Sequence, residues 1–366
     1  MTRFWLGGYG GDMGGTADGI GLLAGDDGRA PTTLAYRGVA AAALSPSWLA
    51  QHPTLDVVYA ALEGAGTVQA YARSGESTLA PLGDPVEAGS DVCHIAVAPD
   101  ARSLIASCFG DGRVVRILLD PAGVPMADAA HKAAALRAAL LGETAEAQVP
   151  AGVGAAASDP YALDGEPRAS HAHAAAFLPD GRIATTDLGF DLVRIWRVGA
   201  EGLRIDHEVV LPRGTGPRHM VVHPSGHLHV VTELSAEVFT LAAGRDGTWA
   251  IVSSTTSSLI ANVGADFPSE LARSRDGETL YTALRGSNTI AALRVKGSGE
   301  TVEPLSVTDS GVDWPRHILV HEGLLLVAGQ RSDDITVVDL DERTGAAGSI
   351  RHHAPAPAPT HFLPVR

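Results

Sequence analysis

One pattern of apolar and polar positions recurs six times along the chain. Each copy is a strand of alternating apolar and polar residues, a short polar turn with Gly, Ser or Asp, and a second alternating strand. The six copies span residues 57–72, 103–118, 182–198, 227–242, 279–295 and 324–340. The pattern therefore predicts six antiparallel β-units.

A further strand precedes each hairpin and ends in a turn signal, near Pro53, Pro99, Pro179, Pro224, Arg275 and His321. Most of these turns are about 45–50 residues apart, which suits a four-stranded propeller blade and is too long for a β-helix rung. The N-terminal "FWLGGYG…GIGLLAGDDG" supplies another strand pair, and the tail "HHAPAPAPTHFLPVR" is placed to close the ring beside it. We predict an all-β fold, a seven-bladed β-propeller formed by residues 1–366 as one domain; an array of β-sandwiches is the alternative.

One interval between turns is longer than the others, because Pro99 and Pro179 lie about 80 residues apart. The extra residues include "ADAAHKAAALRAALLGETAEAQ" (127–148), whose Ala- and Leu-rich composition favours a helix, followed by a loop rich in Gly, Ala and Pro. We therefore predict a helical or irregular insertion around residues 124–169.

Polar side chains recur at two places in each unit. Successive strands of a blade alternate in direction, so the start of the first strand and the turn between the second and third lie at the same end of the ring. The strand starts carry Trp48, His94, His173, Arg218, His219, Glu270, Arg316 and His317. The turns carry Glu63, Phe109, Leu188, Glu233, Arg285 and Gln330. We predict that these residues form one rim around a central funnel.

The net charge narrows the choice of partner. With 27 Lys and Arg against 42 Asp and Glu, the formal charge is −15, which argues against nucleic acid or an anionic membrane. Cys93 and Cys108 have no metal-site spacing and form no disulfide framework, and no signal peptide or apolar span is evident. We expect a cytoplasmic protein without a cofactor or metal; the sequence predicts no particular oligomeric state.

The rim residues suit the chemistry of a small anionic or ester substrate. Arg218, Arg285 and Arg316 can bind a carboxylate or phosphate through paired hydrogen bonds, and Glu233 and His173 can serve as acid or base. The simpler alternative is that these side chains only join neighbouring blades. No G-x-S-x-G elbow or Walker loop is present, so a serine hydrolase or nucleotide site is not predicted.

Several motifs resemble one family. "GTGPRHMVVHPSG…VVTELSAEV", "SHAHAAAFLPDGR…TTDLGFDLVRIW" and "LYTALRGSNTI" are similar to the lactonase family of seven-bladed propellers, which includes the cycloisomerase-type 6-phosphogluconolactonases. The chain also resembles the fungal carboxymuconate lactonising enzymes. The resemblance implies a catalytic set of His173, Arg218, Glu233 and Arg285, with His171 as a substitute for His173. Ser45, Ser107 and Leu284 depart from the Asn that the family usually has in those turns.

Three functions follow as hypotheses. The first is a metal-independent lactone hydrolase acting on a sugar lactone such as 6-phosphogluconolactone, and the second is a lactonising or cycloisomerase enzyme acting on a muconate-like diacid. The third is a non-catalytic propeller that binds a ligand or protein. For a small-molecule substrate, the predicted binding residues are His94, His171, His219, Arg316, Gln330 and Glu63, and Arg316 and Arg168 are candidates for holding a phosphate.

Overall fold

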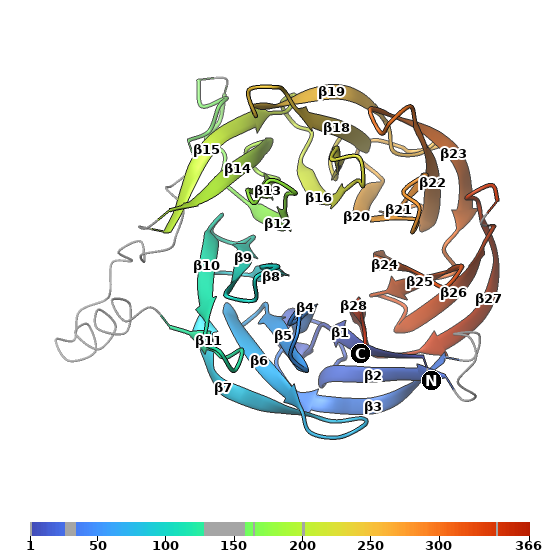
Figure 1. Cartoon of the computed structure of the whole chain (residues 1–366). Helices are drawn as coiled ribbons and strands as arrows, with labels where there is room; N and C mark the ends of the chain where they lie inside the picture. Colours follow the sequence, from blue (N-terminus) through green and yellow to red (C-terminus); the bar gives the residue numbers. More distant parts are fainter. Residues whose placement is uncertain (1, 26–33, 128–157, 164, 200–201, 342) are drawn as a thin grey trace.

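The computed structural model describes residues 2–25, 34–127, 158–163, 165–199, 202–341 and 343–366. Seven four-stranded antiparallel sheets stand side by side in a closed ring (Figure 1). The prediction of an all-β, seven-bladed propeller is confirmed. That residues 1–366 act as one domain stays a prediction.

Six of the sheets use four consecutive strands, with the first strand innermost. Their bounds are β4 Pro46–Gln51, β5 Val57–Leu62, β6 Thr67–Arg73 and β7 Leu79–Glu87; β8 Val92–Val97, β9 Ser103–Cys108, β10 Val114–Leu119 and β11 Pro125–Met126; β12 Ala172–Phe177, β13 Ile183–Asp187, β14 Leu192–Gly199 and β15 Gly202–Val210. The other three are β16 Pro217–Val222, β17 Leu228–Thr232, β18 Glu237–Ala243 and β19 Trp249–Thr256; β20 Phe267–Arg273, β21 Thr279–Arg285, β22 Thr289–Lys296 and β23 Thr301–Asp309; β24 Pro315–His321, β25 Leu324–Gly329, β26 Asp334–Leu340 and β27 Ala347–Pro355.

The seventh sheet joins the two ends of the chain. Its strands are β1 Arg3–Gly8, β2 Gly19–Gly25, β3 Leu34–Ala42 and β28 Pro359–Pro364, with the one short helix of the described residues, η1 Gly11–Met13, after β1. The C-terminal strand β28 takes the innermost position and pairs antiparallel with β1, where Phe4 lies opposite Pro364. The predicted closure of the ring by the C-terminal tail is confirmed.

The predicted insertion is described only in part. Its start forms β11, the outermost strand of the sheet that begins with β8, and residues 158–163 and 165–171 lead back to β12. The predicted helix at 127–148 falls almost wholly on residues 128–157, outside the described residues.

Apolar side chains fill the spaces between neighbouring sheets. One such cluster joins Phe4 of β1 and Phe362 of β28 to Leu326 of β25 and Val337 of β26, all buried. The alternating pattern of the strands produces this packing, because each strand sends every second side chain to the same face of its sheet.

Every innermost strand carries a break in pairing register near the end at which the strand begins. In β16, for example, Pro217 pairs with Thr232 and His219 with Val231, and equivalent shifts occur in β4, β8, β12, β20 and β24 and in the pairing of β28 with β1. At such a bulge two residues oppose one, so strict alternation between the two faces is lost. Two successive residues of one strand, such as Arg218 and His219, therefore both reach groups in other sheets.

The second residue of each pair forms a deep layer that fills the channel. Trp48 lies at its centre, with ring centroids 4.3 Å from His94, 5.4 Å from His219, 5.4 Å from His317 and 4.0 Å from His361. Glu270 completes the layer, 3.0 Å from His219 and 3.8 Å from His317. All of these side chains except Trp48 fall below a tenth exposed.

Burial keeps three imidazoles of the deep layer neutral, those of His94, His317 and His361. Burial lowers the pKa of His94 and of His361 well below the ordinary histidine value, with neighbouring imidazoles adding to the effect. Burial also lowers the pKa of His317 to about 4, although Glu270 opposes the shift. The Nδ1 atoms of His94 and His317 accept hydrogen bonds from the backbone N–H of Ala175 and Phe362.

Replacing Phe362 with Ala should destabilise the ring closure. The side chain is 1% exposed and packs against β1, and removing a buried Phe costs roughly 3–5 kcal/mol. The exposed Val252→Ala on β19 is the matched control and should cost under about 0.5 kcal/mol. Urea denaturation of both variants tests this, and equal midpoints would show that β28 does not hold the ring.

Acid should destabilise the protein through the deep layer. A histidine whose pKa is lower in the folded state takes up a proton more readily when the protein unfolds, so it stabilises the fold fully only above its unfolded pKa. For His317 this stabilisation is lost as the pH falls from about 6.5 to about 4. Each such group contributes at most about 1.4 kcal/mol per pH unit.

The variant His361→Phe should flatten this pH dependence, while the exposed Val252→Ala, which removes no titratable group, should leave it unchanged. Unfolding free energies measured between pH 7 and 4.5 test the difference. Parallel curves for the parent and His361→Phe would contradict the assignment.

Candidate functional site

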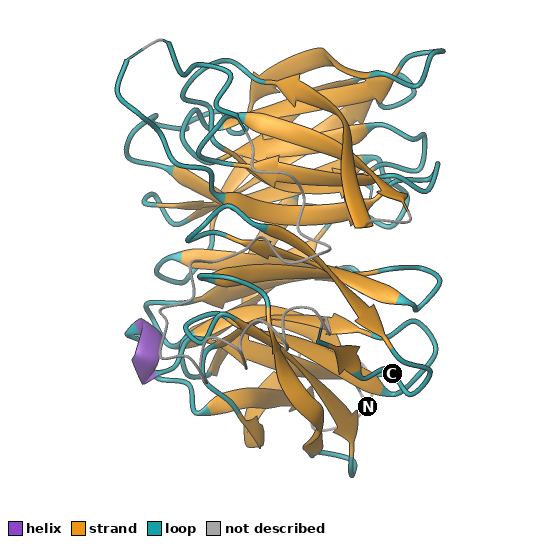
Figure 2. Ribbon diagram, turned by 90° about the vertical axis from the view of Figure 1, so that its left-hand side faces the viewer, coloured by secondary structure: helices purple, strands orange, loops and turns teal. Residues whose placement is uncertain are grey.

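The functional side chains gather at the end of the ring where the innermost strands begin, called the mouth here. The turns that follow β5, β9, β17, β21 and β25 lie at the same end. Figure 2 shows the short helix η1, which follows β1, at this end and both chain termini at the opposite end. The arrangement agrees with the predicted common face for strand starts and second turns.

A glutamate between two guanidinium groups forms the centre of the mouth. Glu233, in the turn after β17, lies with Oε2 2.8 Å from Nε of Arg218 and 2.7 Å from Nη2 of Arg285. Arg218 comes from the bulge of β16, and Arg285 ends β21 of the next sheet. The structure therefore brings together three of the four residues of the predicted catalytic set through direct ion pairs.

Backbone carbonyl groups hold the two arginines in place. Arg218 Nη1 donates to the carbonyl oxygen of Ser269 in the next innermost strand, and Arg285 Nε donates to that of Phe267 at 3.0 Å. The guanidinium of Arg285 also lies 5.4 Å from the ring centre of Trp314. Because both ends of each contact are on the rigid sheets, the guanidinium groups are preorganised.

Glu233 is the most open member of this cluster. Its side chain is 21% exposed, whereas those of Arg218 and Arg285 are 5% and 7% exposed. Burial acts to raise the pKa of Glu233, but Arg285 and Arg218 outweigh it and hold the pKa below its usual range. Burial lowers the pKa of Arg285 to about 9, so at neutral pH the cluster has one negative and two positive charges.

His173, the fourth residue of the predicted set, lies one position into the buried start of β12. Burial, followed by the charges of Arg218, His219 and Arg316, lowers the pKa of His173 well below its ordinary value, so the imidazole is neutral. Its Nδ1 is buried without a hydrogen-bond partner among the described groups. A neutral imidazole with an open nitrogen can accept a proton.

His171, the proposed substitute for His173, has a supporting position. Its Nδ1 lies 2.6 Å from the carbonyl oxygen of Phe109, and its ring stacks on Phe109 with centroids 4.5 Å apart. The His171 backbone N–H donates to Asp187 at 2.9 Å, and Asp187 is itself paired with Arg194. Because His171 is occupied by these contacts, His173 remains the better candidate for proton transfer.

A second polar cluster lies at the mouth beside the first. Tyr9 donates its hydroxyl to both carboxylate oxygens of Glu63 at 3.0 Å, and Arg316 Nη2 donates to the Tyr9 oxygen. Arg316 Nη1 also donates to Gln330 at 3.2 Å, and its guanidinium lies 4.7 Å from the Tyr9 ring centre. The predicted binding residues Glu63, Arg316 and Gln330 are thus brought together by an unpredicted residue.

Tyr9 is the site residue that the sequence reasoning missed. It directly follows β1, the second strand of its sheet, and so occupies the same turn position as Glu63, Glu233 and Gln330. The signal is present in "GGYGG", but the N-terminal strand pair lacks the continuous repeat that reveals the equivalent turn in the other sheets.

Two predicted binding residues lie away from these clusters. His94 and His219 were expected on the common rim, but the structure places them in the deep layer against Trp48, one residue further along their strands than Cys93 and Arg218. The bulge explains the difference, because it gives each strand two inward positions at different depths.

The phosphate candidate Arg168 has protein partners instead. It pairs with Asp159 and, at 2.5 Å, with Asp191, whose carboxylate also accepts from the backbone N–H of Gly214 and Gly216. Through Asp191, these contacts hold the segment that leads into β12 against the turn before β16.

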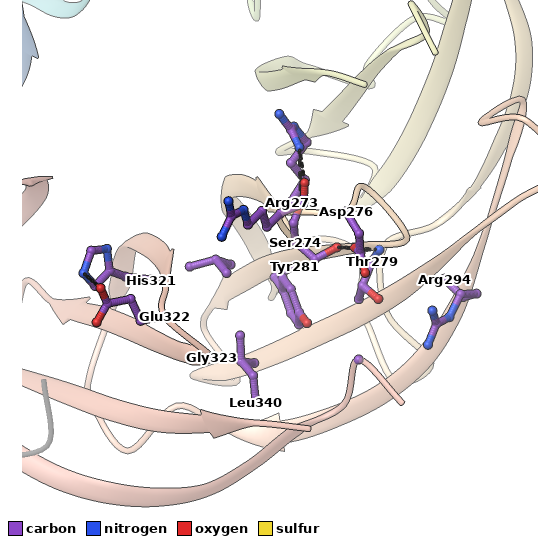
Figure 3. A pocket seen from close by; sticks show the side chains of 13 residues that line it. Arg273, Ser274, Asp276, Thr279, Tyr281, Arg294, His321, Glu322, Gly323 and Leu340 are labelled. Carbon is purple, nitrogen blue, oxygen red and sulfur yellow. Dashed lines mark hydrogen bonds and ion pairs between the residues drawn. The ribbon is translucent and has the colours of Figure 1, made fainter. Parts of the chain in front are cut away.

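A cavity of about 1040 Å³, whose lining is drawn in Figure 3, is formed by turns at the opposite end of the ring from the mouth. The turns after β20, β24 and β26 form it, and Arg273, Tyr281, Arg294 and His321 are among the residues that line it. None of the predicted site residues lines this cavity, so it provides a place for control substitutions.

The described ranges contain no metal-binding cluster and no membrane-spanning helix. No three His, Cys, Asp or Glu side chains there are arranged to hold a metal ion, and no helix there is long and apolar enough to cross a membrane. Cys93 and Cys108 are both buried and free.

Known proteins share this architecture. The chain is 25% identical to the 6-phosphogluconolactonase of Bacillus subtilis over 318 residues, 82% of each protein. A solved structure from Lactobacillus plantarum superposes with a TM-score of 0.81 at 22% identity, over all of both chains. The periplasmic gluconolactonase of Pseudomonas aeruginosa also gives 0.81, at 20% identity over 100% of this chain and 99% of that one.

The family model described as "Lactonase, 7-bladed beta-propeller" matches residues 4–364. Because this match spans nearly the whole chain, the protein belongs to the lactonase family of seven-bladed β-propellers.

Proposed function

We propose that the protein hydrolyses the lactone of a sugar acid at the mouth of the propeller. The observation that carries the proposal is the ion-pair cluster of Glu233 with Arg218 and Arg285, beside a neutral His173. Family membership and the gluconolactonase and 6-phosphogluconolactonase names of its relatives support the substrate class.

The residues divide naturally between the steps of lactone opening. His173 takes a proton from water, and the resulting hydroxide attacks the acyl carbon. A guanidinium of Arg218 or Arg285 then stabilises the developing oxyanion, since both are charged and fixed before the reaction. The ring carbon–oxygen bond breaks, and the ring oxygen must gain a proton to leave as an alcohol.

Glu233 is better suited to holding the arginines than to removing a proton. Its carboxylate is already paired with Arg218 at 2.8 Å and Arg285 at 2.7 Å, whereas Nδ1 of His173 has no hydrogen-bond partner among the described groups. The negative charge of Glu233 offsets the repulsion between Arg218 and Arg285. We therefore assign the base to His173 and the alignment of the oxyanion site to Glu233.

The contacts of the two phosphate candidates favour an unphosphorylated sugar lactone. Arg168 is bound by Asp159 and Asp191, and Arg316 by Tyr9 and Gln330, so neither guanidinium is left open for a phosphate. A phosphorylated substrate would have to displace one of these contacts.

A panel of lactones tests the proposed function. We expect hydrolysis of δ-gluconolactone with higher kcat/KM than of 6-phosphogluconolactone. Arg285→Ala and Glu233→Gln should each lower kcat/KM by about 10²–10³-fold, as loss of an oxyanion donor or its support does. Arg273→Ala, at the opposite end of the ring, is the control and should retain the parent rate.

The same panel includes muconate-like diacids. Turnover of a diacid without hydrolysis of any lactone would replace the proposal with the lactonising reaction, and binding without turnover would favour a binding platform. Parent-like rates for both mouth variants would show that the site lies elsewhere.

The assignment of His173 as base is tested by His173→Asn. We expect kcat to fall about 10²–10⁴-fold with KM little changed. The lowered pKa of His173 leaves the base unprotonated at neutral pH, so the parent kcat should stay level from pH 8 to 6 and fall only under more acid conditions. Stopped assays corrected for spontaneous hydrolysis measure both effects; a variant as fast as the parent would remove His173 from the mechanism.

A further inference from the structure

The proposed reaction leaves one task without an assigned group. The ring oxygen leaves as an alkoxide unless a proton reaches it, and an aliphatic alkoxide is a poor leaving group. At neutral pH, Glu233 and His173 both begin without a proton to give, because each has a lowered pKa: for Glu233 its two arginines outweigh burial, and for His173 burial dominates. A group that is protonated before the reaction starts would complete the site.

Tyr9 has the surroundings expected of such a group. Its phenol is 5% exposed, yet its oxygen meets one carboxylate and one guanidinium, Glu63 at 3.0 Å and Arg316. The buried Tyr59 has a simpler contact, since its hydroxyl donates to the backbone oxygen of Gly123 at 2.8 Å. A phenol held between two charged side chains is therefore a special feature of the mouth.

Tyr9 and its partners lie close to the Glu233 cluster. Arg316 and Arg218 occupy equivalent bulge positions in two sheets that have one other sheet between them. In that intervening sheet, the backbone carbonyl of Ser269 accepts from Arg218, and the Ser269 hydroxyl donates to the carbonyl oxygen of Pro315 at 2.7 Å. After burial, Arg285 and Arg218, the charge of Arg316 also acts on the pKa of Glu233. The two clusters therefore belong to one site.

We infer that Tyr9 is the catalytic acid of this site and gives its hydroxyl proton to the ring oxygen of the lactone as the acyl carbon–oxygen bond breaks. The inference rests on the proposed function. The bonding electrons pass to the ring oxygen, which takes the phenol proton and leaves as an alcohol, while the phenolate remains beside Arg316. The proton that His173 took from water then returns to the phenolate through solvent, so no proton is gained or lost overall.

Glu63 and Arg316 stabilise Tyr9 before and after it gives up its proton. Burial and Glu63 raise the pKa of Tyr9, and Arg316 opposes them, so the phenol is protonated at neutral pH. Glu63 orients the hydroxyl and keeps the proton on it. Arg316 stabilises the phenolate once the proton has gone, because its N–H already points at the phenol oxygen.

The test compares Tyr9→Phe with the parent on two lactones that differ in leaving group. On δ-gluconolactone, whose leaving group is an aliphatic alcohol, we expect kcat to fall about 10²–10⁴-fold with KM within a few fold. On dihydrocoumarin, whose leaving group is a phenol that departs readily as an anion near its pKa of about 10, the loss should be under tenfold.

Two controls separate chemistry from folding. Tyr59→Phe removes a buried hydroxyl far from the mouth and should retain the parent kcat, and Glu63→Gln keeps an acceptor for the Tyr9 hydroxyl and should lose less than Tyr9→Phe. Equal losses on both lactones, or a loss under tenfold on δ-gluconolactone, would overturn the role of Tyr9. If the parent hydrolyses no lactone, the proposed function itself fails, which is a different outcome.

Discussion

The pairing of β28 with β1 is the constraint on which the rest of the structure depends. Backbone hydrogen bonds between the two ends of the chain close the ring, so no sheet edge at the seam is left to solvent. A closed ring fixes all seven innermost strands with the same end towards the mouth. Residues more than 300 positions apart in sequence, such as Tyr9 and Arg316, can then meet through their side chains.

Charged side chains are buried at the mouth, which costs free energy. A guanidinium taken out of water is stable only if its donors are satisfied, and the structure meets this with Glu233 and with backbone carbonyls of neighbouring strands. The cluster of Glu233, Arg218 and Arg285 has two positive charges to one negative, in a chain whose formal charge is −15. That contrast supports a site for developing negative charge more strongly than any single contact does.

The fold could be predicted because it repeats. Alternation of period two and turn signals at regular spacing are local properties, and each of the six clear copies reinforced the others. The turn position of Glu233 and the strand-start position of Arg218 followed from strand direction alone. Their ion pair could not be predicted, since it depends on rotamers and on the bulge that turns Arg218 towards its neighbours.

The sequence also could not predict how deep each inward side chain lies in the channel. Without the bulge, His219 would point away from the channel if Arg218 pointed into it, and the rim would hold one residue per strand. The prediction placed both residues on one rim because it had no way to separate them. Tyr9 could not be predicted because its sheet is assembled from the two ends of the chain, so the sequence contains no continuous repeat there.

The two layers of the channel are coupled through charge. Trp48 and the neutral imidazoles of His94 and His361 pack against one another deeper in the channel than the arginines. Burial dominates the lowered pKa of His94, and the nearby imidazoles and Arg218 add to it. A positive charge in the deep layer would in turn repel Arg218 and compete for Glu270. Because Trp48 and the imidazoles of His94 and His361 are uncharged, the guanidinium groups next to them can remain charged and in place.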